Sequence, residues 1–357
     1  MDFIETIYLD GDAVVILDQN LLPSNEKYVR LTNINHMWDA IKTLQVRGAP
    51  AIGIAAAMGI YVHMRNVFVT TSGSFATEFD AGCKFLSTSR PTAVNLNWAL
   101  ARMKMVFDKG GETAEILENL RLEAEAIKQE DMEVCKKIGE YGAKLLKPNA
   151  GVLTHCNAGS LATSKYGTAL APVYIAHEQG ITIRVYADET RPVLQGARLT
   201  AFELHRAGVD TTLICDNMAA VVMSKGLVDI VFVGCDRVAK NGDTANKIGT
   251  LGVAILAKNF GIPFYVCAPF STIDFDTAAG DGIVIEERDG AEITDLWYKE
   301  KMAPAGIKTF NPAFDVTPAE LITGFVTEKG ILKPPFQQES EVLDWEWLAP
   351  DPSRIIE

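Results

Sequence analysis

The sequence has no basic segment and no long apolar segment. Its 33 lysines and arginines are outnumbered by 46 aspartates and glutamates, which gives a formal net charge of -13. Without a run of cations to neutralise phosphates, we expect neither nucleic acid nor an anionic membrane as a partner. No apolar stretch reaches the roughly 18 residues of a transmembrane helix, and Met1 does not open a basic and then apolar leader. We therefore expect a cytoplasmic protein.

Cysteine and histidine are scarce and scattered. None of the six cysteines forms a Cys-x-x-Cys pair, and several lie in apolar runs, so reduced thiols are expected rather than disulfides. His155 has no second histidine at a suitable spacing and no neighbouring carboxylate cluster in the sequence, so no metal site is predicted. The Gly-x-Ser-x-Gly elbow, the Gly-x-Gly-x-x-Gly fingerprint and the P-loop are also missing. These absences argue against a serine hydrolase, a dinucleotide-binding enzyme of the usual kind and a P-loop NTPase.

The second half of the sequence alternates short apolar runs with amphipathic segments. This alternation predicts an α/β fold whose C-terminal domain holds a parallel, Rossmann-like sheet with right-handed crossovers. The predicted strands span residues 152–155, 181–186, 212–215, 230–234 and 264–267, with helices over 197–207 and 244–260. A last helix is expected to begin at the capping box of Thr317 and to end before Gly330. The acidic tail from Gln337 is expected to pack across a domain or subunit surface.

Polar residues follow four of these predicted strands. Because the carboxyl ends of parallel strands lie at one edge of a sheet, and ligands bind beyond that edge, we expect these residues to line a functional site. The four groups are His155-Cys156-Asn157, Asp188-Glu189-Thr190-Arg191, Asp216-Asn217 and Cys235-Asp236-Arg237.

The first half predicts a smaller α+β domain. Residues 1–30 alternate short apolar runs with turns, the pattern of a small antiparallel meander, and Asn33 or Asn35 can cap the helix that follows. Arg47 precedes a segment rich in alanine and glycine, and Arg90 precedes another expected helix with Pro91 in its first turn, so both suit an anion at a helix N-terminus. Tight helix packing explains the first segment equally well, and a lone arginine is usually a surface residue. A charged helical pattern over residues 112–146 joins the halves, and we predict domains of residues 1–121 and 122–357.

Two of the polar groups could carry chemistry. Asp236 ends an apolar run and has Lys247 further along the chain, which suits an acid and an anion-holding cation, although it could instead cap the next helix or pair with Arg237. Cys156 precedes an expected helix start, a position that favours the thiolate, although most cysteines are simply small buried apolar residues. With Arg47, Arg90, Gln195 and Lys247 as polar company, the pair suits proton transfer on a small phosphorylated substrate.

These segments resemble the methylthioribose-1-phosphate isomerase family, which belongs with regulatory subunits of the eukaryotic exchange factor for translation initiation. The similar blocks occur in order over about residues 1–335. They are Val46-Arg47-Gly48-Ala49-Pro50-Ala51-Ile52-Gly53, Leu153-Thr154-His155-Cys156-Asn157-Ala158-Gly159, Asp188-Glu189-Thr190-Arg191-Pro192 with Gln195-Gly196-Ala197-Arg198, Gly234-Cys235-Asp236-Arg237, Asn241-Gly242-Asp243 with Ala245-Asn246-Lys247-Ile248-Gly249-Thr250, and Asn311-Pro312-Ala313-Phe314-Asp315-Val316-Thr317-Pro318. Two departures are Cys235, where the family usually has alanine, and Met58, where it commonly has tyrosine; Met58 could alter a pocket.

The resemblance implies a homodimer of two-domain chains that isomerises a pentose 1-phosphate in methionine salvage, without metal or nucleotide cofactor. It implies Cys156 and Asp236 as the catalytic pair, and as substrate contacts Arg47, Gly48, Ala49, Arg90, Gln195, Asn246 and Lys247. Asp236 would act as a protonated acid if burial among residues such as Val233 and Ile248 raised its pKa by about three units, at a cost of about 4 kcal/mol.

Several reactions stay open at this point. The same site could act on 5-deoxyribose 1-phosphate, because methylthio and methyl groups both need an apolar pocket. Ribose 1,5-bisphosphate would need a second cluster of cations that the sequence does not show. A regulatory subunit without catalysis is the alternative from another class, and the presence of both Cys156 and Asp236 favours the enzyme.

Overall fold

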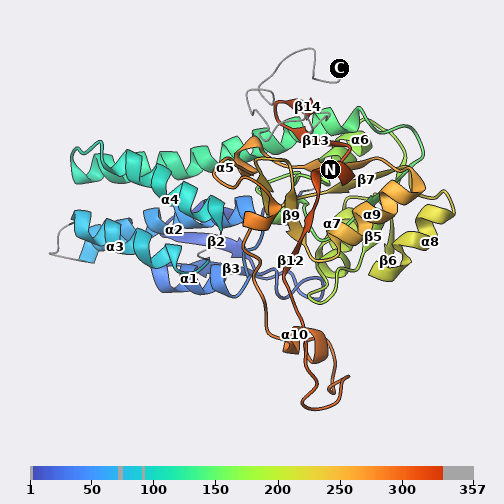
Figure 1. Ribbon diagram of the computed structural model, residues 1–357. Helices are drawn as coiled ribbons and strands as arrows, with labels where there is room; N and C mark the ends of the chain where they lie inside the picture. The colour runs from blue at the N-terminus through green and yellow to red at the C-terminus, as the bar shows by residue number, and fades with distance from the viewer. Residues whose placement is uncertain (1–2, 71–74, 91–92, 333–357) are drawn as a thin grey trace. The chain divides into compact units, whose positions relative to one another are not determined.

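The computed structural model describes residues 3–70, 75–90 and 93–332 of the 357-residue chain (Figure 1). Contacts between residues divide the chain into two compact units. The N-terminal unit holds Phe3–Cys135 and Gly159–Gly167, and the C-terminal unit holds Lys136–Ala158 and the chain from Thr168 onward. The division therefore falls inside the long helix α5 (Thr113–Ala143). The domain boundary between residues 121 and 122 stays a prediction.

The N-terminal unit combines a small sheet with helices, as its sequence pattern predicts. Strands β1 (Ile7–Asp10), β2 (Ala13–Leu17) and β3 (Tyr28–Leu31) form an antiparallel meander. The Asn33 side chain caps α1 by accepting a hydrogen bond from the His36 N–H. The helices are α1 (Ile34–Lys42), α2 (Ala49–Thr70), α3 (Phe75–Ser87), α4 (Val94–Phe107) and the first part of α5. The helix expected after Arg90 is thus α4, while Pro91 lies outside the described residues.

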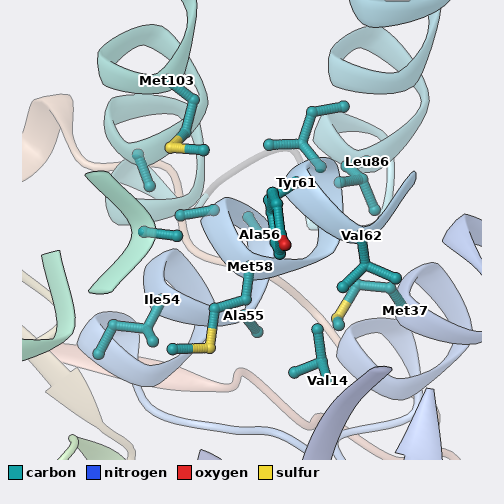
Figure 2. Close-up of a cluster of buried hydrophobic side chains, with 14 of the residues drawn as sticks. Val14, Met37, Ile54, Ala55, Ala56, Met58, Tyr61, Val62, Leu86 and Met103 are labelled. Carbon is teal, nitrogen blue, oxygen red and sulfur yellow. The ribbon is translucent and has the colours of Figure 1, made fainter. Parts of the chain in front are cut away.

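Helix α2 is buried on every side from Ala51 to Val62 and forms the centre of this unit. Figure 2 shows its residues Ile54, Ala55, Ala56 and Met58 among apolar side chains of the neighbouring elements. These neighbours come from the meander and from three helices: Val14 of β2, Met37 of α1, Leu86 of α3 and Met103 of α4. Met58 is fully buried in this cluster, so its methionine is a core side chain.

The C-terminal unit is built on a seven-stranded sheet of the predicted Rossmann-like type. The strand order is β14-β13-β10-β7-β4-β5-β6, and all neighbours are parallel except the last strand, β14, which is antiparallel to β13. The strands are β4 (Ala150–Thr154), β5 (Ile183–Asp188), β6 (Asp210–Ile214), β7 (Ile230–Val233), β10 (Phe264–Cys267), β13 (Gly324–Thr327) and β14 (Gly330–Leu332). Every residue of β4, β7 and β10 is buried, as expected for strands covered on both faces.

Two expected helices of this unit are partly or wholly strands. Residues Thr244–Lys247 form strand β9, and helix α9 begins only at Thr250 and ends at Phe260. The strand forms because β9 is paired on both sides, by β8 (Arg237–Ala239) and by β12 (Phe314–Thr317). With β11 (Ile273–Asp274), these strands make a second sheet in the order β11-β8-β9-β12.

The helix predicted from Thr317 is also wrong. Beyond one 3₁₀ turn at Ala319–Leu321, the chain forms β13, which pairs with β10 through Gly324 and Tyr265, and then β14. A capping box is only a local signal, and pairing with a sheet strand outweighs it here. The acidic tail from Gln337 lies outside the described residues.

Short helices complete the C-terminal unit: α6 (Ala171–Glu178), α7 (Ala201–Arg206), α8 (Ala219–Ser224) and α10 (Ala291–Thr294). The helix predicted over residues 197–207 is confirmed, except that its first turn, Gly196–Thr200, is a π-helix. Figure 1 shows that the segment between β11 and β12, which contains α10, extends away from the four-stranded sheet. Within the described residues, no helix is both long enough and apolar enough to cross a membrane.

Candidate active site

Cys156 lies just beyond the end of β4 and is held by two threonines. Its backbone has a φ of 67°, in the left-handed region that non-glycine residues rarely adopt. The Cys156 N–H donates to Thr190 Oγ1 at 2.8 Å, and its carbonyl accepts a hydrogen bond from Thr200 Oγ1 at 2.7 Å. Thr190 and Thr200 come from the segment that follows β5, the neighbouring strand. The strained conformation is therefore fixed by hydrogen bonds on both sides of the residue.

The helix expected directly after Cys156 is wrong. Only the single 3₁₀ turn Ser160–Ala162 follows, and α6 does not begin until Ala171. The intervening chain packs in the N-terminal unit, where Gln19 Nε2 donates to the Leu161 carbonyl at 2.7 Å. These tertiary hydrogen bonds replace those of a helix. No α-helix begins at Cys156, so the predicted stabilisation of a thiolate by a helix N-terminus is wrong.

Asp236 lies between the end of β7 and the start of β8. Its backbone N–H donates to the carbonyl of Ala245 at 2.9 Å. The side chain is exposed, so the expected burial among Val233 and Ile248 is wrong. Helix α9 begins after Gly249 without any side-chain cap, which excludes a capping role for Asp236 there.

The loops that carry Cys156 and Asp236 are in contact. Their strands are neighbours, with Leu153 of β4 opposite Val231 of β7. Gly234 then packs so closely on Ala158 that a Cβ at Gly234 would lie 2.6 Å from the Cβ of Ala158. Since Ala158 is two residues after the cysteine and Gly234 is two residues before the aspartate, the close packing brings the two loops together at the carboxyl edge of the sheet.

Three of the predicted substrate contacts are buried polar side chains of the same unit. Lys247, at the end of β9, donates from Nζ to the Ala313 carbonyl at 2.8 Å and lies 4.5 Å from the centre of the Phe314 ring. Asn246 Nδ2 donates to Thr250 Oγ1 at 3.0 Å. Gln195 directly precedes the π-helical turn, and its buried Oε1 has no hydrogen-bond partner among the described residues. Buried polar atoms normally have partners, so this oxygen is a candidate for binding a substrate hydroxyl.

The remaining predicted contacts lie in the N-terminal unit, where two helices begin side by side. Gly48 has a φ of 93° and approaches Ala162 so closely that any side chain would clash. A Cβ at Gly53, in the first turns of α2, would lie 2.9 Å from the carbonyl oxygen of Asn95 near the start of α4. Arg47 and Arg90 precede these two helices, so Arg47, Gly48, Ala49 and Arg90 are grouped around two helix N-termini, which attract anions.

His155 has two carboxylate neighbours, which the sequence did not indicate. Ligand atoms of His155, Asp188 and Asp216 lie within 4.8 Å of one another. The expectation that no carboxylate cluster accompanies this histidine is therefore wrong, because the sheet brings together residues far apart in sequence. Both ring nitrogens already have partners, Asp188 Oδ2 at 3.0 Å and the Ile248 carbonyl at 2.8 Å. A ring that makes both hydrogen bonds offers no free lone pair to a metal.

A buried polar network supports the other side of the cysteine. Glu203, on α7, accepts hydrogen bonds from Asn157 Nδ2 and from the Tyr174 hydroxyl, the latter at 2.9 Å. Asn157 Nδ2 also donates to Thr200 Oγ1 at 3.1 Å. Sequence reasoning missed Glu203 and Thr200, because an acidic residue and a threonine within an amphipathic helix carry no distinguishing pattern. Asp188, Thr190 and Asp216 could be found, because they follow predicted strands.

The fold and this edge of the sheet define a Rossmann-like α/β protein with a thiol, a carboxyl and a lysine near one another in one unit. The model of the initiation factor 2 subunit family matches residues 45–334. A methylthioribose-1-phosphate isomerase of Symbiobacterium thermophilum is 58% identical over 344 residues, covering 95% of this chain and 96% of the relative. A 5-deoxyribose 1-phosphate isomerase of Petrotoga mobilis is 54% identical over 334 residues, covering 93% of this chain and 96% of the relative.

A solved structure agrees with these relatives. The crystal structure of 5-methylthioribose 1-phosphate isomerase from Pyrococcus horikoshii OT3 superimposes with a TM-score of 0.87 at 42% identity, covering 94% of each chain. The chain belongs to the initiation factor 2 subunit family, and within it the chain is an isomerase.

Proposed function

We propose that this isomerase converts 5-methylthioribose 1-phosphate into 5-methylthioribulose 1-phosphate, an aldose–ketose isomerisation in methionine salvage. The observation that carries the proposal is the contact between the loops of Cys156 and Asp236, made through Ala158 and Gly234. That contact occurs in a chain 58% identical to a relative named for this reaction. A thiol and a carboxyl at adjacent strand ends can act on neighbouring atoms of one sugar.

In the proposed reaction, protonated Asp236 donates its proton to the ring oxygen of the sugar as the bond from that oxygen to C1 breaks. The Cys156 thiolate removes the proton from C2, and the electron pair of the broken C2–H bond forms a double bond between C1 and C2. The C2 hydroxyl of this phosphorylated enol then loses its proton as C1 gains one, which gives the ketose. Because Asp236 is exposed, we infer that the bound sugar covers the carboxyl and favours its neutral form.

A direct shift of hydride from C2 to C1 would give the same product. Sugar labelled with deuterium at C2 distinguishes the two routes. Loss of the label to water supports proton removal by Cys156. Complete retention of the label in the product would exclude an obligatory exchange with solvent. Cys156 would then flank a hydride shift without removing the C2 proton.

The other polar residues are proposed as substrate contacts. Arg47, Gly48, Ala49 and Arg90 would bind the phosphate, because two helix N-termini and two guanidinium groups favour a dianion. Gln195 and Asn246 would bind sugar hydroxyls, and Lys247 would supply a further positive charge. Lys247 already lies against a carbonyl and a ring, so its binding requires these contacts to be exchanged or shared.

The second candidate substrate is 5-deoxyribose 1-phosphate, which a relative 54% identical to this chain is named for. Both sugars present an apolar group at C5. Initial rates with both sugars, at matched concentrations and with ribose 1,5-bisphosphate as a third substrate, decide between them. The proposal expects the highest kcat/KM for the methylthio sugar, whereas a higher value for the deoxy sugar assigns the second function. Turnover of neither sugar contradicts both assignments.

We also propose that the protein acts as a homodimer. In support, the segment between β11 and β12 carries large apolar side chains that are exposed in the chain, with 82% of Val284 and 76% of Phe310 accessible. Light scattering after size-exclusion chromatography measures the mass directly. A single-chain mass at micromolar concentration contradicts the dimer without affecting the assigned reaction.

A further inference from the structure

His155 is a buried histidine whose two ring nitrogens both face hydrogen-bond acceptors. Nδ1 lies 3.0 Å from Asp188 Oδ2, and Nε2 lies 2.8 Å from the carbonyl oxygen of Ile248. The histidine is 1% exposed and Asp188 is not exposed at all. A neutral imidazole carries one N–H and can satisfy only one acceptor. The geometry therefore requires one additional proton, either on the ring or on the Asp188 carboxyl.

We propose that His155 and Asp188 form a proton-sharing pair with no net charge, and that this pair positions the Lys247–Gly249 turn against the Cys156 strand end. In one form an imidazolium faces a carboxylate, and in the other a neutral imidazole accepts a hydrogen bond from a protonated Asp188. Both forms keep the hydrogen bond from Nε2 to Ile248. His155 is thus a positioning residue, and its kinetic role rests on the proposed function.

The surroundings of the ring favour the extra proton. Asp188 Oδ1 is buried without a hydrogen-bond partner among the described residues, so the charge of this carboxylate has little other compensation. The other acidic groups near the pair are Glu189, Asp216 and Asp315. Burial lowers the pKa of His155, but the hydrogen bond and the charge of Asp188 outweigh it, and the pKa is raised. Burial disfavours the charged form of a carboxyl, so it raises the pKa of Asp188.

The pair joins two segments that the proposed chemistry needs together. His155 directly precedes Cys156, and Ile248 directly follows Lys247. Gly249 completes the contact, because it has a φ of 106° and a Cβ there would lie 2.8 Å from the ring carbon Cε1. The Asp315 carboxylate holds the far side of this turn by accepting from the backbone N–H groups of Gly249 and Leu251. Loss of the His155 bond would therefore free one side of the turn.

The pair can be tested without substrate by nitrogen NMR of the histidine rings. The chain has only five histidines, and the His155→Asn variant identifies the signal of this one. At about pH 8, where an ordinary imidazole with a pKa of about 6.5 is neutral, we expect either two ring-bound hydrogens or one ring-bound hydrogen together with a strongly downfield hydrogen shared with the carboxyl. A ring that carries one N–H at about pH 8, with no hydrogen shared with Asp188, would overturn the pair. This readout stands even if the assigned reaction fails.

Two matched variants separate the two hydrogen bonds in kinetics. His155→Asn places a donor near Nδ1 and loses the bond to Ile248, whereas His155→Gln places a donor near Nε2 and keeps it. We expect kcat/KM to fall about 100-fold in His155→Asn, because small misplacements of a reacting group have effects of this size, and much less in His155→Gln. The exposed His205→Gln is the control. Equal losses in the Asn and Gln variants, or none, would overturn the positioning role.

A variant at Gly249, which contacts the His155 ring, tests the same proposal if His155→Asn does not fold. Gly249→Ala moves the ring or the turn while leaving both members of the pair in place. We expect it to lower kcat/KM and to shift the alkaline limb of the pH–rate profile toward lower pH, because a displaced turn no longer supports the second N–H. Wild-type kinetics and an unchanged profile in Gly249→Ala would contradict the proposal.

Discussion

The two units of the chain gather their candidate functional groups in different ways. In the C-terminal unit, the ends of parallel strands bring together side chains that are distant in sequence, and hydrogen bonds with Thr190 and Thr200 fix the backbone of Cys156. In the N-terminal unit, the starts of α2 and α4 bring together backbone N–H groups and two arginines. The first arrangement defines atomic positions, while the second supplies a region of positive potential.

This difference separates two kinds of contribution to an enzyme. Chemistry at a reacting bond depends on positions within fractions of an ångström, which buried hydrogen bonds can fix. Binding of a phosphate dianion depends mainly on charge and tolerates more movement. Substitutions in the C-terminal unit should therefore change kcat, and those in the N-terminal unit should change KM.

The largest effect is expected at Asp236. Replacing it by asparagine removes the transferable proton but keeps the shape, so kcat should fall by about 10²–10⁴-fold. Because the side chain is exposed, the melting temperature should stay unchanged, which calorimetry of the same preparation checks. A variant that keeps most of its turnover would remove the acid role from Asp236.

The next effect concerns the buried network beside Cys156. Glu203→Leu removes the acceptor of the Tyr174 hydroxyl and one of the two acceptors of the Asn157 amide, which keeps Thr200 Oγ1. Each lost acceptor of a buried donor costs about 1–3 kcal/mol. We expect the free energy of unfolding, measured by urea denaturation, to fall by about 2–5 kcal/mol. Glu203→Gln retains one acceptor oxygen and is the matched control. Equal stability of the Leu variant and wild type would show that the network adds nothing.

Arg47 tests the N-terminal unit. Arg47→Ala removes a guanidinium at the start of α2, and a hydrogen bond to a charged group contributes about 1.5–3 kcal/mol, so KM should rise about 10–100-fold. Steady-state kinetics should show kcat within a few-fold of wild type. Arg47→Lys keeps the charge and should lose less. A fall in kcat larger than the rise in KM would reverse the expected division between the two units.

The smallest effect is a dependence of stability on pH from Asp131 of α5. Burial raises the pKa of this carboxyl to about 6, although it accepts a hydrogen bond from the Ser164 N–H at 2.7 Å. A folded-state pKa above the ordinary value means that the group stabilises the fold below about pH 4 and loses this contribution as the pH rises through 6. The loss is at most about 3 kcal/mol.

Asp131→Asn mimics the protonated acid and isolates this contribution. Relative to wild type, the variant should gain stability between pH 4 and pH 7, as measured by urea denaturation at each pH. A difference between variant and wild type that does not change with pH would show that Asp131 titrates normally.

Much of the architecture follows from local sequence patterns. Apolar runs bounded by turns identify the meander and the central strands, because a strand buried on both faces needs such a run whatever its neighbours are. Asn33 identifies the start of α1, because capping involves only residues within one turn. The polar residues that follow the strands mark the carboxyl edge of the parallel sheet, because the end of a strand depends on where its apolar run stops.

The errors occur where a distant partner decides the local structure. Residues 244–247 are a strand because β8 and β12 pair with them. Residues 324–327 and 330–332 are strands because β13 pairs with β10 and β14 pairs with β13. The chain after Cys156 forms no α-helix because tertiary hydrogen bonds replace helical ones. One of these is donated to the Leu161 carbonyl by Gln19, 142 residues away in sequence. A pattern within a short window does not contain these partners.

The sequence by itself therefore determined the parallel α/β class, the residues placed at the strand ends and the presence of a thiol and a carboxyl among them. Only the tertiary structure decided which groups share a hydrogen bond: Thr190 and Thr200 with the cysteine backbone, and His155 with Asp188 and Ile248. The reason is physical. Burial and periodicity depend on neighbours along the chain, whereas protonation and hydrogen bonding depend on which atoms the folded sheet brings within about 3 Å.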